Sequence, residues 1–400
     1  MGSVQDIGAS PKPATEPGKE GETSRNGPPR SGVFFDVDGN QVRLLRDGRE
    51  MYPAMLEAIA RAEREILLEM YWFQGDTAGL LFRDALVTKA QQGVAVRVSF
   101  DAIGSIGAPW SMWEPVLAAG GQVVEFAPIS PLRRRFRVKA LNHRDHRKIL
   151  VVDEHIGFTG GMNIGDPWLP AEQGGQDWRD DAIEVRGPIA ADLRSLFFET
   201  WRREGRIPPP DARRLSRKVS GRIVVLANQH GPKRSIRNTY IKGIRHAKER
   251  IEITNPYFLP GLIVLAAIRN ARRRGVAVRI LVPGINDVWL VSMAMSSIIG
   301  RLLESGVRVF AYQGRVLHAK TGVFDETLVT VGTYNLDPRS RRYNRECNLA
   351  VDDAAVARRA RESFEKDLKS STELSLASWK DRPLHHRILA WLAYLLRPFL

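Results

Sequence analysis

Apolar residues along the chain follow two spacings, one typical of strands and one typical of helices. Residues 94–98 alternate valine with other residues, which predicts a strand that buries one face. Residues 55–59 carry Met, Leu and Ile at helical spacing, which predicts a helix ahead of that strand. The order helix, strand, helix, strand recurs further along the chain, and this alternation predicts an α/β fold.

The same pattern occurs twice. The string Gly-Val-Ala-Val-Arg stands at 93–97 and again at 275–279. Ahead of these strings, the similar segments 58–66 and 243–251 each lead into a strand that ends on aromatic residues. This internal repetition predicts two copies of one α/β lobe, related by pseudo-two-fold symmetry.

Five segments are expected along the chain. Three consecutive prolines at 208–210 stand among basic residues and indicate a linker between the lobes. The first residues are rich in Gly, Pro, Ser and Glu, and their charges cancel, which is typical of disorder. The expected segments are a disordered tail at 1–32, lobe one at 33–205, a linker at 206–220, lobe two at 221–370, and an amphipathic tail at 371–400.

Charge and composition narrow the class of partner. The chain has 400 residues, with 60 Lys plus Arg against 45 Asp plus Glu, and therefore a net charge of +15. This charge favours nucleic acid, phosphorylated metabolites or an anionic membrane as partner. The single cysteine, Cys347, excludes a disulfide within the chain and a cysteine-based metal cluster. No apolar run in the sequence reaches the roughly 20 residues that span a bilayer.

Each expected lobe contains a His-x-Lys-x-x-x-x-Asp motif. The motif residues are His146, Lys148 and Asp153 in lobe one, and His318, Lys320 and Asp325 in lobe two. Asn163 and Asn335 each follow their histidine by 17 residues. One such motif alone is more often a surface feature, but two copies at matching places in a repeat indicate a site. Because residues two apart on a strand share a face, the lobes would bring four basic groups into one pocket that suits a phosphate.

These residues resemble the phospholipase D superfamily over roughly residues 33–370, and more narrowly the bacterial cardiolipin synthases of the B type. The strings that carry the narrower resemblance are Asn142–Lys148, Gly160–Asn163, Gly332–Ser340, Val42–Leu45 with Met51–Pro53, and Asn255–Pro260. The resemblance implies two tandem phospholipase D-like lobes of α/β class, each a mixed sheet flanked by helices. It also implies that the active site lies between the lobes.

The resemblance further implies a mechanism. One histidine attacks the phosphorus of a phosphodiester to form a phosphohistidine, and the other protonates the leaving alcohol and then deprotonates the incoming one. His146 is assigned as the nucleophile and His318 as the general acid/base, although the pseudo-symmetry allows the reverse. The groups expected to hold the phosphate oxygens are Lys148, Lys320, Asn163, Asn335 and Thr333. Lobe one lacks one hydroxyl donor, because Gly161 stands where lobe two has the threonine. Neither a metal nor a cofactor is expected, since the lysines supply the charge.

An attacking imidazole needs a carboxylate on its other ring nitrogen. The resemblance places this acid downstream of each motif, at Asp180 in lobe one and at Glu346 in lobe two. Asp153 and Asp325 count with the catalytic motif residues, but the expected role for both is structural, in buttressing the loop or the lysine.

Two further segments allow two interpretations each. Residues 132–139 hold five basic side chains, Arg133, Arg134, Arg135, Arg137 and Lys139, which predict either a solvated loop or a mouth that docks on anionic headgroups. Residues 384–400 carry apolar side chains at helical spacing, with arginines beside them. They predict either a helix packed on the domain or an interfacial membrane helix, and we favour the latter.

The favoured hypothesis is a phosphatidyltransferase that joins two phosphatidylglycerols, or phosphatidylglycerol and another phospholipid, and releases glycerol. A phospholipase D that uses water as acceptor is the alternative. A nuclease of the same fold suits the charge, but the sequence has no basic stretch with interleaved aromatic residues. A membrane-binding module without activity leaves the duplicated motif unexplained. The expected partners are an anionic phospholipid membrane and phosphatidylglycerol, without nucleic acid, at the cytoplasmic side of a bacterial cell membrane. The acceptor alcohol and the oligomeric state stay open.

Overall fold

The computed structural model describes residues 32–130, 142–216, 220–228, 235–285 and 288–397. Residues 1–31 of the predicted tail at 1–32 and the basic segment at 132–139 lie outside the described residues.

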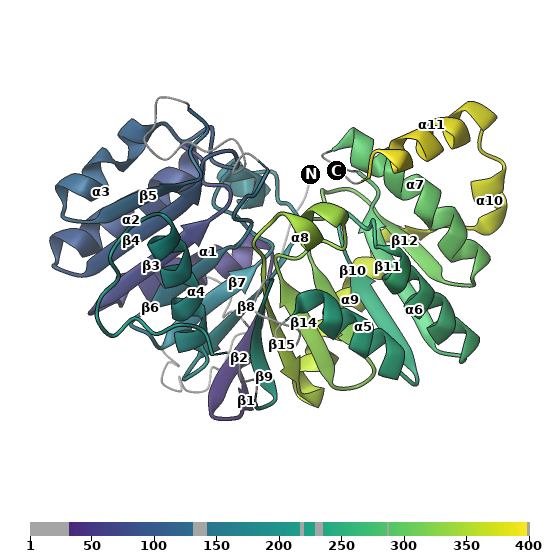
Figure 1. The fold of residues 1–400 in the computed structure, drawn as a ribbon, viewed down its shortest axis with the longest axis horizontal. Helices are drawn as coiled ribbons and strands as arrows, with labels where there is room; N and C mark the ends of the chain where they lie inside the picture. Colours follow the sequence, from purple (N-terminus) through teal and green to yellow (C-terminus); the bar gives the residue numbers. More distant parts are fainter. Residues whose placement is uncertain (1–31, 131–141, 217–219, 229–234, 286–287, 398–400) are drawn as a thin grey trace, which may run out of the picture. The chain divides into compact units, whose positions relative to one another are not determined.

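The first half of the described chain forms one mixed sheet covered by helices (Figure 1). The strand order is β1-β2-β8-β7-β6-β3-β4-β5. The strands are β1 (Phe35–Val37), β2 (Asn40–Arg46), β3 (Glu65–Met70), β4 (Ala95–Asp101), β5 (Gln122–Phe126), β6 (Ile149–Val152), β7 (Ile156–Gly160) and β8 (Asp181–Arg186). The helices are α1 (Asp47–Ala60), α2 (Thr77–Gln91), α3 (Glu114–Ala118) and α4 (Ala190–Arg203). The strands β3, β4 and β5 run parallel, whereas β6 lies antiparallel beside β3.

The second half repeats this architecture with the strand order β16-β12-β11-β10-β13-β14-β15-β9. The strands are β9 (Ile223–Ala227), β10 (Arg250–Thr254), β11 (Ala277–Pro283), β12 (Arg308–Tyr312), β13 (Thr321–Phe324), β14 (Leu328–Gly332), β15 (Cys347–Asp352) and β16 (Ser371–Glu373). The helices are α5 (Ile236–His246), α6 (Leu262–Arg273), α7 (Trp289–Glu304), α8 (Pro338–Arg342), α9 (Ala354–Lys369), α10 (Leu376–Lys380) and α11 (Leu384–Leu395). Because β16 is hydrogen-bonded to β12, the sheet of lobe two extends beyond the expected boundary at residue 370.

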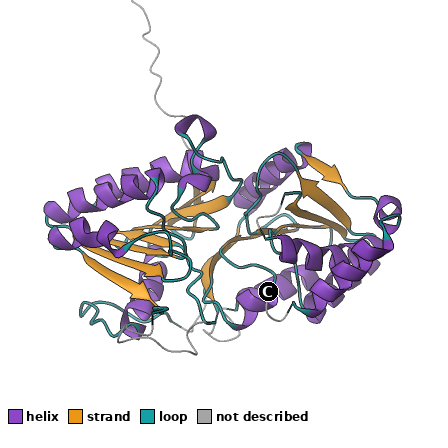
Figure 2. Cartoon of the chain, turned by 90° about the horizontal axis from the view of Figure 1, so that it is seen from above, coloured by secondary structure: helices purple, strands orange, loops and turns teal. Residues whose placement is uncertain are grey.

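Side-chain alternation divides the apolar residues among several cores. In β6, Leu150 and Val152 contribute to the core of lobe one, whereas Ile149 and Val151 contribute to a second core. Successive residues of a strand point to opposite faces, so one four-residue strand supplies both. The second core also contains Val323 of β13 and apolar residues of α4 and α9, and it therefore joins the two lobes. Figure 2 shows the helices that line the two sheets.

One edge of each sheet gathers the segments that carry the predicted site. In lobe one, Glu69 near the end of β3 lies opposite Ile149 at the start of β6. In lobe two, Thr254 at the end of β10 lies opposite Thr321 at the start of β13. We call this edge, at which β3, β4, β10 and β11 end, the carboxyl edge. The predicted histidines precede β6 and β13 and therefore lie at the carboxyl edge in both lobes.

The C-terminal helix α11 lies across α7. It buries Ala390, Ala393 and Tyr394, but large apolar side chains such as Ile388 and Trp391 are about half exposed. The helix therefore packs on the domain and also presents an apolar face outward. Among the described helices, none is both long enough and apolar enough to cross a membrane.

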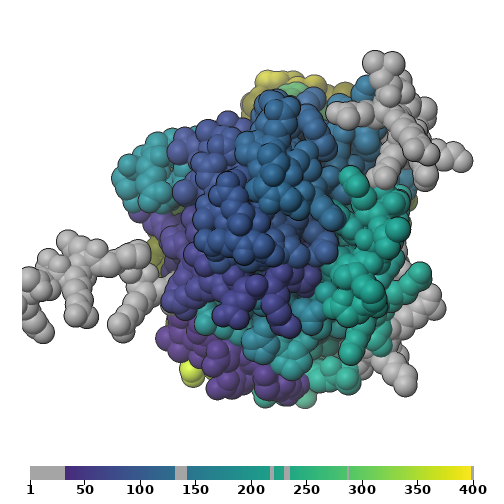
Figure 3. Space-filling view, turned by 90° about the vertical axis from the view of Figure 1, so that its left-hand side faces the viewer, coloured from purple at the N-terminus to yellow at the C-terminus, as the bar shows by residue number. Residues whose placement is uncertain are grey.

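A buried ion pair holds the segment that leads to the first histidine. Arg144 and Asp101 are each 1% exposed, and the guanidinium Nη2 donates to the carboxylate at 2.7 Å. The Arg144 guanidinium also donates to the carbonyl oxygen of Ala127, and the backbone N–H of Asp145 donates to the same carboxylate. This pair fixes the approach to the site from the end of β4. The space-filling view of Figure 3 looks onto this lobe, whose residues run from purple through blue to teal.

We expect Asp101→Asn to lower the free energy of unfolding by about 3 to 5 kcal/mol, because it leaves the Arg144 charge buried without its counterion. Urea denaturation measures this change. The matched control is Asp84→Asn, which breaks an exposed pair with Arg83 and should cost no more than about 1 kcal/mol. Equal effects of the two substitutions would contradict a dominant role for the buried pair.

Candidate active site

The two predicted histidines lie at equivalent places in the repeat and are both buried. His146 is 7% exposed and His318 is 6% exposed, and each stands just before a short apolar strand at the carboxyl edge. Lys148 and Lys320 are buried beside them, at 1% and 0% exposed. The structure thus brings together four basic side chains, although each residue of the second motif lies 172 residues after its counterpart in the first.

Each histidine is bound by an acid from the opposite lobe. Nδ1 of His146 lies 3.0 Å from Oε2 of Glu346, and Nδ1 of His318 lies 2.8 Å from Oδ2 of Asp180. The predicted acids are therefore adjacent to histidines, but the pairing crosses between the lobes. With Nδ1 held by a carboxylate, Nε2 is the ring nitrogen that can act as base or nucleophile.

Backbone hydrogen bonds reinforce this pairing between a histidine of one lobe and an acid of the other. The N–H of His146 donates to the carbonyl oxygen of Arg345 at 3.0 Å, and the N–H of His318 donates to that of Arg179 at 2.7 Å. Each arginine immediately precedes the acid that binds the histidine. Short parallel bridges between these segments hold both histidines and both acids in register.

The two acids are held by different neighbours. Glu346 accepts hydrogen bonds from the hydroxyls of Thr333 and Ser340, and Asp180 accepts one from Nε1 of Trp168 at 3.0 Å. Thr333 was expected to bind phosphate. Its hydroxyl instead donates to Glu346 and accepts from the N–H of Cys347, so its single proton is already committed.

The glycine in lobe one has a steric reason. A Cβ atom on Gly161 would lie 2.1 Å from Oδ1 of Asp180, well inside van der Waals contact. The carboxylate of Asp180 thus occupies the space that a side chain at residue 161 would need. The missing hydroxyl of lobe one is therefore matched by the indole N–H of Trp168, which donates to the same acid.

Aromatic rings surround both histidines, and the sequence patterns did not single them out. Tyr71 contacts His146 edge-on, with ring centroids 4.8 Å apart, and its ring also lies 5.0 Å from Nζ of Lys148. Trp178 and Tyr257 lie near His318 at 5.9 and 6.4 Å. The aromatic ends of the strands in both repeats were the available signal, because those strands end at the same edge as the motifs.

The two predicted asparagines follow β7 and β14 and are buried at 2% and 3% exposed. Oδ1 of Asn163 accepts from the backbone N–H of Trp72 at 3.1 Å, which fixes its amide plane. Oδ1 of Asn335 has no hydrogen-bond partner among the described residues. Because this oxygen only accepts hydrogen bonds, the amide NH2 of Asn335 is the group that could donate to a phosphate oxygen.

The two motif aspartates lie away from this site. Asp153 follows β6 and accepts hydrogen bonds from the backbone N–H groups of residues 63–65. Asp325 follows β13 and accepts from residues 248–250 in the same way. Because a four-residue strand separates each aspartate from its lysine, the two stand at opposite edges of the sheet. Both aspartates, counted among the predicted catalytic residues, thus lie away from the histidines, and the structural role expected for them stays a prediction.

Burial and the neighbouring lysines control the ionisation of the histidines. Burial, followed by Lys148 and Lys320, lowers the pKa of His146 well below its usual value. Burial and Lys320 also lower the pKa of His318, but the carboxylate of Asp180 opposes that shift. Both imidazoles are therefore biased toward the neutral form, and His146 more strongly so.

The ionisation of the two acids and of Lys148 also differs between the halves of the site. Burial raises the pKa of Glu346 to about 8. Burial also disfavours ionisation of Asp180, but His318 and Lys320 outweigh it and lower the pKa of this acid. Burial and the charge of Lys320 lower the pKa of Lys148 to about 7. The two halves of the site are thus similar in geometry and different in charge.

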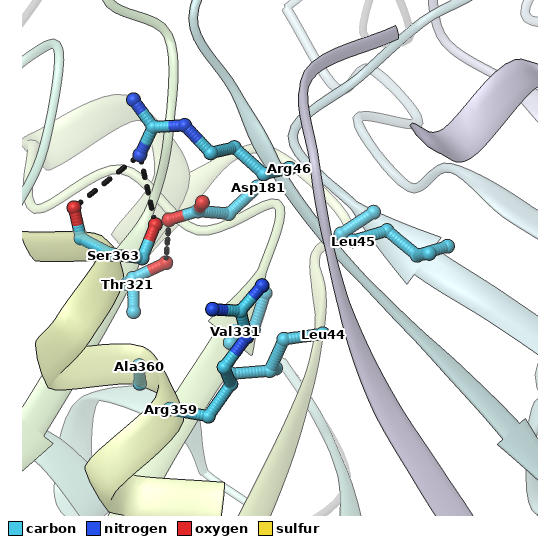
Figure 4. A pocket seen from close by; sticks show the side chains of 10 residues that line it. Leu44, Leu45, Arg46, Asp181, Thr321, Val331, Arg359, Ala360 and Ser363 are labelled. Atoms are coloured by element: carbon cyan, nitrogen blue, oxygen red, sulfur yellow. Dashed lines mark hydrogen bonds between the residues drawn. The ribbon is translucent and has the colours of Figure 1, made fainter. Parts of the chain in front are cut away.

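A second set of contacts joins the lobes behind the acids. Asp181, next to Asp180, accepts a hydrogen bond from Oγ1 of Thr321 at 2.6 Å, and Arg46 donates to Oγ of Ser363 at 2.9 Å (Figure 4). These residues line a small cavity together with Leu44 and other side chains from both lobes. The cavity contains none of the predicted site residues, so it belongs to the interface. Within the described ranges, no group of three His, Cys, Asp or Glu side chains is placed to hold a metal ion.

Comparison with known families and relatives agrees with this geometry. The family model described as "Cardiolipin synthase, PLD-like domain" matches residues 55–171 and 240–368. The major cardiolipin synthase ClsA of Bacillus subtilis is 34% identical over 91% of this chain and 76% of its own length. The cardiolipin synthase of Alkalihalophilus pseudofirmus is 33% identical over 90% of this chain and 72% of its own length.

Solved structures show the same fold at much lower identity. Phosphatidylserine synthase from Haemophilus influenzae aligns with a TM-score of 0.67 and 16% identity, over 90% of this chain and 95% of its own. Polyphosphate kinase from Porphyromonas gingivalis aligns with a TM-score of 0.58 and 16% identity, over 88% of this chain and 52% of its own. The tandem arrangement of lobes in an α/β fold is confirmed.

We expect Gly161→Ala to reduce kcat by about 100-fold, because the new Cβ displaces Asp180 and a shift of about 1 Å in a positioning group can have this effect. The control is Thr333→Ser at the equivalent position, which keeps the hydroxyl that binds Glu346 and should retain near-normal activity. Steady-state turnover of both variants measures the effect, and an unchanged Tm shows that each variant is folded. An unchanged kcat in Gly161→Ala would show that Asp180 tolerates displacement.

The pKa of Lys148 predicts weaker anion binding at alkaline pH. Sulfate keeps its charge between about pH 6 and 9, so its inhibition constant reports the charge of the site. Above pH 7 the lysine loses its proton, and we expect sulfate affinity to fall as pH rises further. Lys148→Arg stays charged over this range and should show a smaller loss, the remainder being due to Glu346, whose pKa of about 8 lets it become negative as pH rises. Constant sulfate affinity of the unmodified protein up to pH 9 would contradict this assignment.

Proposed function

The chain belongs to the cardiolipin synthase family with phospholipase D-like domains, and we propose that it joins two phosphatidylglycerols into cardiolipin and releases glycerol. The reciprocal binding of each histidine by an acid of the other lobe is the observation that carries this proposal. It supplies two oriented imidazoles beside two buried lysines, which is what stepwise transfer through a covalent intermediate requires.

In the first step of the proposed mechanism, Nε2 of His146 attacks the phosphorus of one phosphatidylglycerol. A P–N bond forms while the bond from phosphorus to the glycerol headgroup oxygen breaks. His318 gives its proton to that oxygen, and glycerol leaves. Lys148, Lys320 and the two asparagines hold the non-bridging oxygens, which carry the negative charge of the transition state.

In the second step, a headgroup hydroxyl of another phosphatidylglycerol attacks the phosphohistidine. His318 accepts the proton of this hydroxyl, the P–N bond breaks, and cardiolipin forms. Water in place of the hydroxyl would give phosphatidic acid instead. The burial of both histidines supports transfer over hydrolysis, because it limits the access of bulk water to the intermediate.

The charge difference between the halves supports the division of roles. A nucleophile must be neutral, and the pKa of His146 is lowered well below its usual value. A general acid must hold a proton, and the ionised Asp180 opposes the lowering of the pKa of His318, so His318 holds a proton more readily than His146 does. We therefore assign attack to His146 and proton transfer to His318.

We further propose that the protein works at the surface of an anionic bacterial membrane that contains phosphatidylglycerol. The exposed apolar face of α11, with Trp391 among its residues, supports this proposal because such faces bind the interfacial region of bilayers. The predicted location on the cytoplasmic side and the predicted absence of nucleic acid as a partner stay predictions.

The first test incubates the full chain with phosphatidylglycerol vesicles in EDTA and identifies the lipids by mass spectrometry. We expect cardiolipin, and we expect His146→Ala and His318→Ala each to lose about 100-fold or more in rate. His246→Ala is the matched control, because His246 is exposed on α5 and should be dispensable. Phosphatidic acid without cardiolipin would indicate a hydrolase, and the absence of any lipid product would overturn the lipid mechanism.

A phosphodiester with a p-nitrophenol leaving group separates the two histidines. This leaving group departs without a proton, so His318→Ala should still form a trapped phosphoenzyme, whereas His146→Ala should not. The opposite result would reverse the assignment.

A further inference from the structure

Exposed apolar side chains that follow equivalent strands occupy the same positions in both repeats. Ala95 and Ala277 begin the equivalent strands β4 and β11 and are 182 residues apart. Ile103 and Ile285 have the same separation, and so do Ile106 and Val288. All four side chains are exposed, at 37%, 51%, 75% and 40% in that order. A single exposed apolar residue is ordinary, but the same two positions exposed in both lobes indicate a shared purpose.

Ile103 and Ile285, each two residues after its strand, lie at the edge that holds the histidines. They directly follow β4 and β11, which end at the carboxyl edge. In lobe one, Oγ of Ser105 donates to the carbonyl oxygen of Tyr71 at 3.0 Å and accepts from the N–H of Phe73. Tyr71 is the residue whose ring contacts His146. The loop that carries Ile103 and Ile106 is therefore fixed to the wall of the active site.

Positive charge accompanies the apolar side chains. The short helix α8 directly follows the segment of Asn335 and lies where the two lobes meet (Figure 1). Its residues Arg341 and Arg342 are exposed. A surface that combines exposed arginines with exposed aliphatic side chains suits the headgroup region of an anionic bilayer, because headgroups neutralise the charges and acyl chains accept the apolar groups.

We propose that Ile103, Ile106, Ile285 and Val288, here called the apolar rim, insert into an anionic phospholipid bilayer and hold the carboxyl edge against it. This proposal rests on the proposed function, since a lipid headgroup must reach the buried histidines while its acyl chains stay in the membrane. The two lobes then contact the bilayer symmetrically, one on each side of the reactive phosphate. The apolar rim thus determines which face of the molecule meets the membrane, which α11 alone does not.

The test replaces the whole apolar rim by serine and measures vesicle binding by sedimentation, with vesicles of equal parts phosphatidylglycerol and phosphatidylcholine. We expect at least a tenfold loss of affinity. The matched control is Ile207→Ser, because Ile207 is an apolar residue that is 93% exposed but lies away from the carboxyl edge. Its neighbours Pro209 and Asp211 line a surface depression together with Ala95, which is at the start of β4. Affinity equal to that of the unmodified protein in the rim variant would overturn the proposal.

Turnover of a short-chain phosphatidylglycerol below its micelle concentration separates this inference from the proposed function. Such a substrate needs no bilayer, so the rim variant should process it at the normal rate while its activity on vesicles falls at least tenfold. If the unmodified protein turns over neither substrate, the proposed function fails. If the rim variant then still binds vesicles more weakly than the unmodified protein, the docking proposal stands. If size-exclusion chromatography shows a dimer that only the rim variant abolishes, the rim is instead an interface between two copies and the membrane proposal is wrong.

Discussion

Each reactive imidazole in this fold takes its orientation from a carboxylate of the other lobe, and much of the remaining structure serves to keep that exchange in place. The backbone bridges next to Arg179 and Arg345 align the exchanging segments. The core shared by β6, β13, α4 and α9 prevents the lobes from separating. A buried His–carboxylate pair loses its geometry if its partners move by about 1 Å, so the lobe interface is part of the catalytic apparatus.

The exchange also explains why the acids differ in their surroundings. Glu346 reaches its histidine with a longer side chain and leaves room for Thr333, whereas Asp180 is shorter and lies against Gly161. The repeat therefore conserves the distance between acid and imidazole and varies the groups behind the acid. Burial raises the pKa of Glu346, whereas His318 and Lys320 lower that of Asp180, so the two carboxylates ionise differently and favour different protonation states of their imidazoles.

Sequence patterns predicted the duplicated α/β lobes and the paired His and Lys residues, because repeat spacing and strand alternation are local properties, whereas the acids Asp180 and Glu346 were expected only from the family resemblance. The exchange of acids between lobes was not predictable, since spacing along one chain does not report which lobe a side chain faces. The position of Asp153 was within reach of prediction, because the apolar run 149–152 is a full strand that separates it from Lys148. Helix α1 begins at Asp47 and contains Pro53, so the apolar spacing that starts at Met55 identified the helix but not its beginning. Helix α11 packs on α7 through Ala390, Ala393 and Tyr394, whereas the large aliphatic side chains that gave its helical spacing stay about half exposed, so the spacing did not report which face packs.

Fusion of the two lobes into one chain has a consequence for the symmetry of the chemistry. A homodimer of single lobes, related by a true two-fold axis, would have to give its two histidines identical surroundings at rest. Such an assembly could differentiate a nucleophile from an acid only after an asymmetric substrate had bound. In the fused chain, Gly161 and Thr333 can diverge independently, so the two imidazoles are already unequal in the empty site. The covalent link thereby allows the direction of phosphoryl transfer to be encoded in the protein before any lipid arrives.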